Sequence, residues 1–89
     1  MRITINISPI LQPFTDNHAV VVIDGATIRD CLDDLVFRYP KLQEIMFDSN
    51  RVFNKIIIIV NNKVIMPTNL DTKVSDNEEI SIFMPMAGG

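Results

Sequence analysis

The stretch VSDNEEISIFMPMAGG, residues 74–89, contains a turn, a strand and a tail in that order. Asp76-Asn77 is a turn signal, because both residues favour turns and asparagine tolerates a positive φ. Glu79–Phe83 is expected to be the last strand, with isoleucine at every second position. It runs directly into Met84–Gly89, which ends in two glycines, residues that fit poorly in a strand. The segment therefore predicts a final strand that leads into a thin tail.

Two further strands are predicted near the N-terminus. The first has isoleucine at positions 3, 5 and 7, alternating with polar residues, which is the period of a half-buried strand. Pro9 and Pro13 then interrupt the pattern, so residues 9–17 are expected to form a connection. Ala19–Ile23 is rich in β-branched residues and stops at the turn pair Asp24-Gly25. We expect these strands to form an antiparallel pair.

A helix is predicted after this pair. Thr27 is a suitable N-cap, and Asp30 stands three residues later in the capping-box position. Pro40 ends the helix, because the residue before a proline avoids the α region. Lys41–Phe47 favours a further short helical turn. The apolar stripe of the main helix consists of Ile28, Cys31, Leu32, Leu35, Val36 and Tyr39.

The remaining elements complete an α+β domain. Ile56–Val60 is apolar on both faces, which predicts a central strand, although its outward-facing residues cannot be chosen without an alternation. Asn61-Asn62 suits a tight hairpin turn, and Lys63–Met66 is expected to return as a short strand. This order suits a mixed sheet of about five strands packed on one main helix, with the first and last strands parallel at its centre, as in the ubiquitin-like β-grasp fold. Residues 1–84 would form the domain and 85–89 the flexible tail.

The composition excludes several classes of function. The 89 residues allow one domain, and 47% hydrophobic with 21% charged residues is typical of a soluble globular protein. A net charge of −3 without a Lys/Arg cluster argues against a nucleic-acid partner and an anionic membrane surface. The longest apolar run is too short to cross a bilayer, and the N-terminus lacks the core of a signal peptide. We therefore expect a cytoplasmic protein.

The tail points to chemistry at the carboxylate of Gly89. The bland interpretation of Gly88-Gly89 is a frayed terminus. The functional interpretation is that Gly88-Gly89, which has no side chains, enters a narrow active site of a partner and presents its carboxylate there. A carboxylate is a poor electrophile and needs activation, typically by ATP. The chain has no phosphate-binding glycine loop and no nucleophile–base pair, so partners would have to supply the catalysis.

The sequence resembles the ubiquitin-like sulfur carriers, a family that includes the small subunit of molybdopterin synthase and the thiamine-pathway carrier. Its usual tail has an aromatic or aliphatic residue, a proline, one residue, a small residue and Gly-Gly, which matches Phe83-Met84-Pro85-Met86-Ala87-Gly88-Gly89. Val60-Asn61 matches a recurrent pair of the family. Asn77 stands where the family generally has glycine. The longer loop Asn50–Lys55 and the segment Ser8–Thr15 look closest to the cysteine-biosynthesis branch.

The resemblance implies a protein cosubstrate that is not itself an enzyme. An ATP-dependent E1-like enzyme would adenylate Gly89, and a sulfur donor would convert the adenylate to a thiocarboxylate. A client synthase would then take the sulfur for cysteine, molybdopterin, thiamine or another metabolite. In the cysteine branch a metalloprotease would release the product from the carrier. The carrier would bind no cofactor or metal of its own and would be a monomer when free.

Two alternatives remain open from the sequence. One is a ubiquitin-like modifier that is conjugated through Gly89 to lysines of other proteins. The other is a plain interaction domain with an inert tail.

A docking surface is predicted beside the tail. If Ile80 and Ile82 face the helix together with Met84, alternation places Phe83 on the open face of the sheet, where it could contact a partner. A core position for this aromatic is the alternative. The partner-binding residues expected from pattern and resemblance are Phe83, Val64, Met84, Pro85, Met86 and Ala87.

Other polar and reactive residues favour structural roles. Cys31 is the only cysteine, which excludes an internal disulfide and a cysteine-ligated metal site, and its place on the apolar stripe predicts a buried thiol. His18 is expected to be a solvated loop residue. Asp30, Asp33 and Asp34 are expected to form a solvated helix face, with docking to a basic partner as the minor alternative. The group Asp76, Glu78 and Glu79 is better explained by turn chemistry than by a metal.

Overall fold

The computed structural model describes residues 1–47 and 56–85. It contains five strands and two α-helices, joined in part by 3₁₀ turns. The strands are β1 (Arg2–Ile7), β2 (Val20–Asp24), β3 (Ile57–Val60), β4 (Lys63–Val64) and β5 (Glu79–Phe83). The helices are α1 (Ile28–Arg38) and α2 (Lys41–Met46), and the 3₁₀ helices are η1 (Pro9–Phe14) and η2 (Pro67–Asn69).

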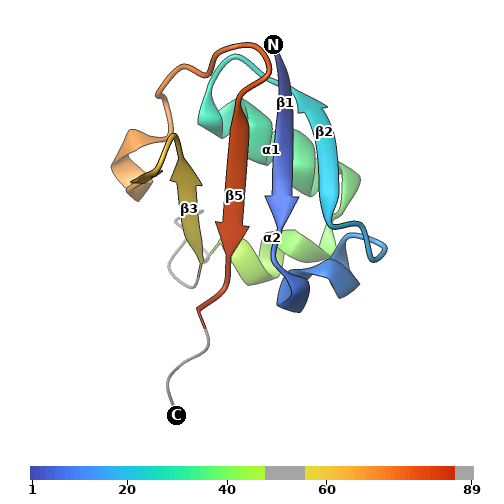
Figure 1. Ribbon diagram of the computed structural model, residues 1–89. Coiled ribbons are helices and arrows are strands. Elements are labelled where there is room, and N and C mark those ends of the chain that lie inside the picture. The colour runs from blue at the N-terminus through green and yellow to red at the C-terminus, as the bar shows by residue number, and fades with distance from the viewer. Residues whose placement is uncertain (48–55, 86–89) are drawn as a thin grey trace.

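The strands form one mixed sheet in the order β2-β1-β5-β3-β4 (Figure 1). β1 and β5, which are far apart in the sequence, lie side by side and parallel, with Ile5 opposite Ile80. β2 pairs antiparallel with β1, and β3 pairs antiparallel with β5. This arrangement confirms the predicted β-grasp topology with the first and last strands at its centre.

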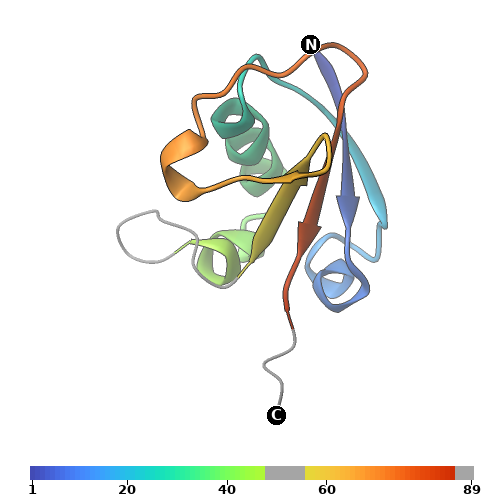
Figure 2. The same ribbon diagram turned by 60° about the vertical axis from the view of Figure 1, so that its left-hand side comes forward.

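The core lies between the sheet and the helices, which cover the same face of it (Figure 2). Isoleucines at alternate positions of β1 and β5 point toward α1 and are almost completely buried. α1 begins as predicted, because the Thr27 hydroxyl accepts a hydrogen bond from the Asp30 backbone N–H at 3.1 Å. The predicted stripe of α1 is buried at every position except Tyr39, which is partly exposed. α2 confirms the short helical turn after Pro40.

Three asparagines adopt the positive φ angles that their turns require. Asn61 and Asn62 have φ of 53° and 64° in the β3–β4 hairpin, and Asn77 has φ of 66° before β5. Asparagine tolerates this region better than most residues with a Cβ. The predicted turns at these positions are confirmed, including the one where the family generally has glycine.

Three predicted elements differ from the structure. Within residues 9–17, where a connection was expected, Pro9–Phe14 forms η1, because its prolines fix φ near helical values, and Leu11 is buried. Only Lys63–Val64 of the predicted strand Lys63–Met66 is regular, and Pro67, which lacks an N–H, begins η2. β3 is an interior strand between β5 and β4, as predicted, but only one of its faces is buried, since Ile57 and Ile59 are partly exposed. The predicted loop Asn50–Lys55 lies outside the described residues.

Within residues 1–47 and 56–85, no helix is both long enough and apolar enough to cross a lipid bilayer.

Candidate functional site

β5 delivers the chain to the predicted tail from the middle of the sheet. It is held between β1 and β3, and the Ser8 backbone N–H donates to the Ile82 carbonyl at 3.1 Å near its end. After Phe83, the Met84 side chain packs against the core, and Pro85 is exposed. The chain therefore leaves the sheet at a fixed point, at the lower end of β5 in Figure 1.

Phe83 lies on the open face of the sheet, which the helices do not cover. Its neighbour Ile82 and the preceding Ile80 are almost fully buried on the helix face. Phe83 is 43% exposed. The structure thus confirms the predicted orientation of this strand and excludes the alternative in which Phe83 is a core aromatic.

Three other apolar side chains share this face beside Phe83. Ile57 is its cross-strand partner, and Ile59 stands opposite Val64 in the β3–β4 pair. The two isoleucines are partly exposed, and Val64 is 61% exposed. We call Phe83, Ile57, Ile59 and Val64 the β3–β5 patch. An exposed apolar patch where the chain leaves the sheet is suited to contact with a protein partner that binds the tail.

The sequence placed Phe83 and Val64 in this site but missed Ile57 and Ile59. The run Ile56–Val60 has no alternation, so no face could be assigned to it. The register supplies the missing information: pairing with β5 places Ile58 in the core and therefore Ile57 and Ile59 on the open face. The Asn61-Asn62 turn was the one sequence signal that could have fixed this register.

The remaining predicted docking residues are placed differently. Met84 packs partly against the core, so only part of its side chain is available beside the patch. Pro85 is exposed next to it. Met86, Ala87, Gly88 and Gly89 lie outside the described residues, and their roles stay predictions.

The other end of the open face is polar. A cavity of about 380 Å³ opens between the β3–β4 hairpin and the turn before β5. Glu78 is engaged there: its carboxylate accepts hydrogen bonds from the Ser75 backbone N–H at 2.6 Å and from the Asn61 side-chain amide. Asp76 likewise accepts from the Arg2 backbone N–H at 2.8 Å. These carboxylates stabilise turns, as the sequence predicted. The cavity is lined by Ile59, Asn61, Asn62, Asn77, Glu78, Glu79 and Ser81.

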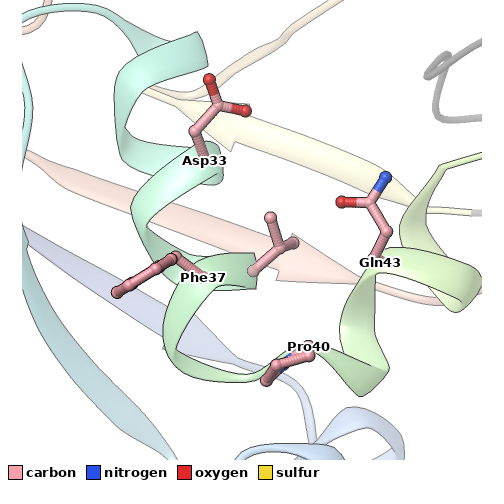
Figure 3. A pocket seen from close by; sticks show the side chains of 5 residues that line it. Asp33, Phe37, Pro40 and Gln43 are labelled. Carbon is pink, nitrogen blue, oxygen red and sulfur yellow. The ribbon is translucent and has the colours of Figure 1, made fainter.

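A second surface cavity lies on the helix side, away from the tail. It measures about 490 Å³ and lies between α1 and α2, with Asp33 and Phe37 from the first helix and Gln43 from the second (Figure 3). Phe37 is 83% exposed. This groove is on the opposite face from the β3–β5 patch, so we do not assign it to the tail site.

Cys31 and His18 are not placed for chemistry. Cys31 is completely buried, and its burial, reinforced by the nearby Asp30 carboxylate, raises the pKa of the thiol to about 11. A buried, protonated thiol is a poor nucleophile. His18 is exposed in the loop before β2, where its Nδ1 lies 3.0 Å from the Thr15 carbonyl oxygen. Within residues 1–47 and 56–85, no group of His, Cys, Asp and Glu side chains could hold a metal ion.

The sheet order, the single main helix and the tail that follows β5 define a ubiquitin-like β-grasp protein. The sequence profile of the ThiS family matches residues 8–89. The chain therefore belongs to the ThiS family of ubiquitin-like sulfur carriers. Among curated proteins, none matches the chain.

Several solved structures share the whole fold. SAMP1, the small archaeal modifier protein 1 of Haloferax volcanii, superposes with a TM-score of 0.87 at 22% identity, covering 100% of both chains. CysO in the Amycolatopsis orientalis BexX/CysO complex has a TM-score of 0.84 at 25% identity, covering 98% of this chain and 99% of that one. CysO of Mycobacterium tuberculosis has a TM-score of 0.81 at 24% identity, covering 94% and 99%.

Proposed function

We propose that this protein carries sulfur as a thiocarboxylate on Gly89. The observation that carries the proposal is the family match, which extends through residue 89 and so includes the Gly-Gly tail. The domain supports it by holding β5 at the centre of the sheet and releasing the chain beside an exposed apolar patch.

The proposed chemistry has two steps, both catalysed by partners. A carboxylate oxygen of Gly89 attacks the α-phosphate of ATP, giving an acyl-adenylate and pyrophosphate. A sulfur nucleophile then attacks the acyl carbon and AMP leaves. Hydrosulfide gives the thiocarboxylate directly, whereas a persulfide gives an acyl disulfide, which a second thiol of the partner cleaves while it is itself oxidised to a disulfide. This chain contributes the acyl group and the surface by which an E1-like enzyme recognises it.

The proposed docking surface is the β3–β5 patch together with Pro85 and the tail. An exposed aromatic flanked by β-branched residues is typical of the centre of a protein interface. The Amycolatopsis CysO structure is a complex with a second protein, BexX, which supports a protein partner for this fold. The activating enzyme and the client synthase would use the patch in turn.

Among possible clients, we favour the cysteine-biosynthesis branch. Two of the similar structures are CysO proteins, and the sequence itself looks closest to this branch in residues 8–15 and 50–55. The acceptor would be an activated serine derivative, whose leaving group the thiocarboxylate sulfur displaces. The acyl group would move from the sulfur of the resulting thioester to the amino group of the new cysteine, and a metalloprotease would hydrolyse that amide with water, which releases cysteine and regenerates the Gly89 carboxylate.

A second candidate function is a protein modifier that forms isopeptide bonds through Gly89. The similarity to a small archaeal modifier protein favours it specifically. Carrier and modifier require the same adenylation, so they differ only in the fate of the activated Gly89.

The test is to express the protein with an N-terminal tag in its source organism and to compare it with a variant lacking Gly88-Gly89. The carrier proposal predicts that the tagged protein runs on denaturing gels at its own size, with no ladder of conjugates. It also predicts a sulfur-dependent growth defect for the truncated variant. Ladders that disappear on truncation would identify a modifier. Growth and gels that do not change on truncation would overturn both tail-based functions.

A further inference from the structure

The strand β2 forms an open edge of the sheet that the proposed function does not use. It pairs on one side with β1 and, within the described residues, has no strand on the other (Figure 1). Its sequence, VVVID, is rich in residues that favour strands. Val20 is 52% exposed and Val22 is 40% exposed on the open face. Exposed edges of this kind can pair with another strand.

The hydrogen bonds to β1 determine which backbone groups of β2 face outward. The Ile7 N–H donates to the Ala19 carbonyl at 2.8 Å, and the Gly25 N–H donates to the Met1 carbonyl at 3.0 Å. Antiparallel pairs exchange these bonds at every second residue, so the odd-numbered residues of β2 face β1. The N–H and C=O groups of Val20, Val22 and Asp24 therefore point away from the sheet.

One of these outward groups is occupied by a side chain. Arg38 Nη1 donates to the Val22 carbonyl at 2.8 Å, while Nη2 lies 3.1 Å from Asp34 Oδ2. The other outward groups of the three residues have no hydrogen-bond partner in the described parts of the chain. Arg38 is half-exposed, so its guanidinium can move aside when another N–H donor reaches this carbonyl. It protects the edge in the free protein in the way that charged side chains blunt other edge strands.

The rim of α1 beside this edge is acidic. Asp30, Asp34 and Arg38 follow one another at i, i+4 spacing, and the Arg38 contact with Val22 fixes this stripe along β2. At the other end of β2, a Cβ on Gly25 would lie 3.3 Å from the carbonyl carbon of Asp30, so the strand and the helix N-terminus meet closely. Asp24 points to the open face with Val20 and Val22, so the carboxylates of this rim are those of Asp30 and Asp34.

We propose that the β2 edge binds an extended segment of a partner protein in which apolar and basic residues alternate. Its backbone would add a strand through Val20, Val22 and Asp24. Its apolar side chains would lie beside the two exposed valines on the open face, and its lysines or arginines would face the acidic rim of α1 on the other side. Main-chain bonds supply the affinity in this mode of recognition, and alternate side chains supply the specificity.

The charges favour such a segment over a second copy of the chain. Two β2 edges paired antiparallel about Val22 would place Asp24 opposite Val20 of the other copy. They would also bring the two acidic rims of α1 together on the same face, with a net charge of −3 on each chain. Like charges brought together along a shared edge oppose pairing. The proposal does not depend on whether Gly89 carries sulfur.

The test uses the full chain and a synthetic hexapeptide, acetylated and amidated, of alternating lysine and valine. Binding is followed by ¹H–¹⁵N NMR and amide hydrogen exchange. We expect slower exchange at Val20, Val22 and Asp24 and about three- to tenfold weaker binding for the Asp30→Asn, Asp34→Asn double variant, because two exposed carboxylates each contribute modestly. Arg38→Ala should bind more tightly, since it frees the Val22 carbonyl and removes a like charge.

Two peptide controls and one variant separate strand addition from general attraction to an acidic protein. A peptide N-methylated on the bonding edge keeps its charge but cannot pair, and a glutamate–valine peptide pairs but is repelled. Val22→Pro removes the outward N–H of Val22, which β1 does not use, and edge strands tolerate proline at such positions. This variant should therefore keep the β1–β2 pair but bind the lysine–valine peptide more weakly. Equal binding of the N-methylated peptide, shifts confined to the β3–β5 patch or the α1–α2 groove, or dimerisation through β2 would each overturn the proposal.

Discussion

Phe83 and Phe37 are both exposed aromatic residues, but they lie on opposite faces of the molecule. Phe83 is part of the β3–β5 patch at the root of the tail, whereas Phe37 lies on α1 beside the α1–α2 groove. This difference gives a matched pair of substitutions. Both side chains are exposed, so replacing either one should change the stability of the fold little.

We expect Phe83→Ala to raise the carrier concentration that half-saturates the E1-like enzyme by about tenfold or more, as for an aromatic anchor at an interface. Phe37→Ala should leave it unchanged. The measurement is carrier-dependent ATP–pyrophosphate exchange. If the two variants half-saturate the enzyme at the same concentration, the β3–β5 patch is not the docking surface.

Gly25 and Cys31 form a close contact between β2 and α1. A Cβ at Gly25 would lie 2.6 Å from the Cys31 sulfur and 3.0 Å from its backbone nitrogen. Gly25→Ala should therefore lower the free energy of unfolding by about 1–3 kcal/mol through overpacking. In a Cys31→Ala background the loss should be smaller by about 1 kcal/mol, because the sulfur is gone. Urea unfolding of the four proteins measures this coupling, and additive losses would contradict the contact.

The Cys31 thiol should also give the stability a specific pH dependence. Burial and the Asp30 carboxylate raise its pKa from 9.0 to about 11 in the folded protein. Between these values the unfolded chain loses the thiol proton while the folded chain keeps it, so stability is present below pH 9 and falls as the pH rises. The unfolding free energy of the wild type relative to Cys31→Ala should decrease across this range. A constant difference would show that the thiol ionises equally in both states.

The sequence could predict single residues where a pattern was present. The helical stripe predicted that Cys31 is buried, and alternation along Glu79–Phe83 offered the open face for Phe83, with a core position as the alternative that the structure then excluded. Ile57 and Ile59 could not be assigned, because an unbroken apolar run has no face until its neighbours set the register. The Gly25 contact was also beyond the sequence, since it depends on how closely β2 and α1 approach.

At the scale of elements, the start of α1 depends on a side-chain cap. Thr27 accepts the Asp30 N–H, and its backbone carbonyl also accepts the Cys31 N–H at 3.1 Å. Thr27→Ala should cost about 1 kcal/mol of stability, because the hydroxyl acceptor is lost. Thr27→Ser keeps the hydroxyl and should cost much less. Thermal or urea unfolding provides the comparison, and equal costs for both variants would show that the cap contributes nothing.

Elements with strong local signals were predictable, and elements set by neighbours were less so. α1 has a cap, a stripe and a terminating proline, and its bounds follow from them. η1 could not be distinguished from a loop, because proline-rich segments suit both. β4 is shorter than expected because a strand extends only as far as its hydrogen bonds to a partner strand. The last of these bonds runs from the Ile65 N–H to the Ile58 carbonyl, and Pro67 then ends the pairing.

At the scale of the whole molecule, the end of β5 and the two proposed binding surfaces, the β3–β5 patch and the β2 edge, occupy different parts of one sheet. β5 leaves the sheet beside the β3–β5 patch, and β2 lies at the far edge of the same sheet. A polar strip that includes Asn6 and Ser81 lies between them on the open face. An activating enzyme at the patch and a basic segment at the β2 edge could therefore bind the protein at the same time.

The topology followed from the order and type of elements, together with the parallel pairing expected of the first and last strands. The branch of the family and the fate of Gly89 did not follow from the fold, since carriers and modifiers share it. That distinction depends on partners that recognise the surface and the tail.

The central claim is that Gly89 carries sulfur, and the intact mass of the protein tests it most directly. The protein is incubated with its E1-like partner, ATP and a sulfur source, and a sample lacking ATP is the control. We predict a mass increase equal to the replacement of one oxygen atom by sulfur, located on Gly89 by fragmentation and absent without ATP. An unchanged mass with an active partner enzyme would contradict the account.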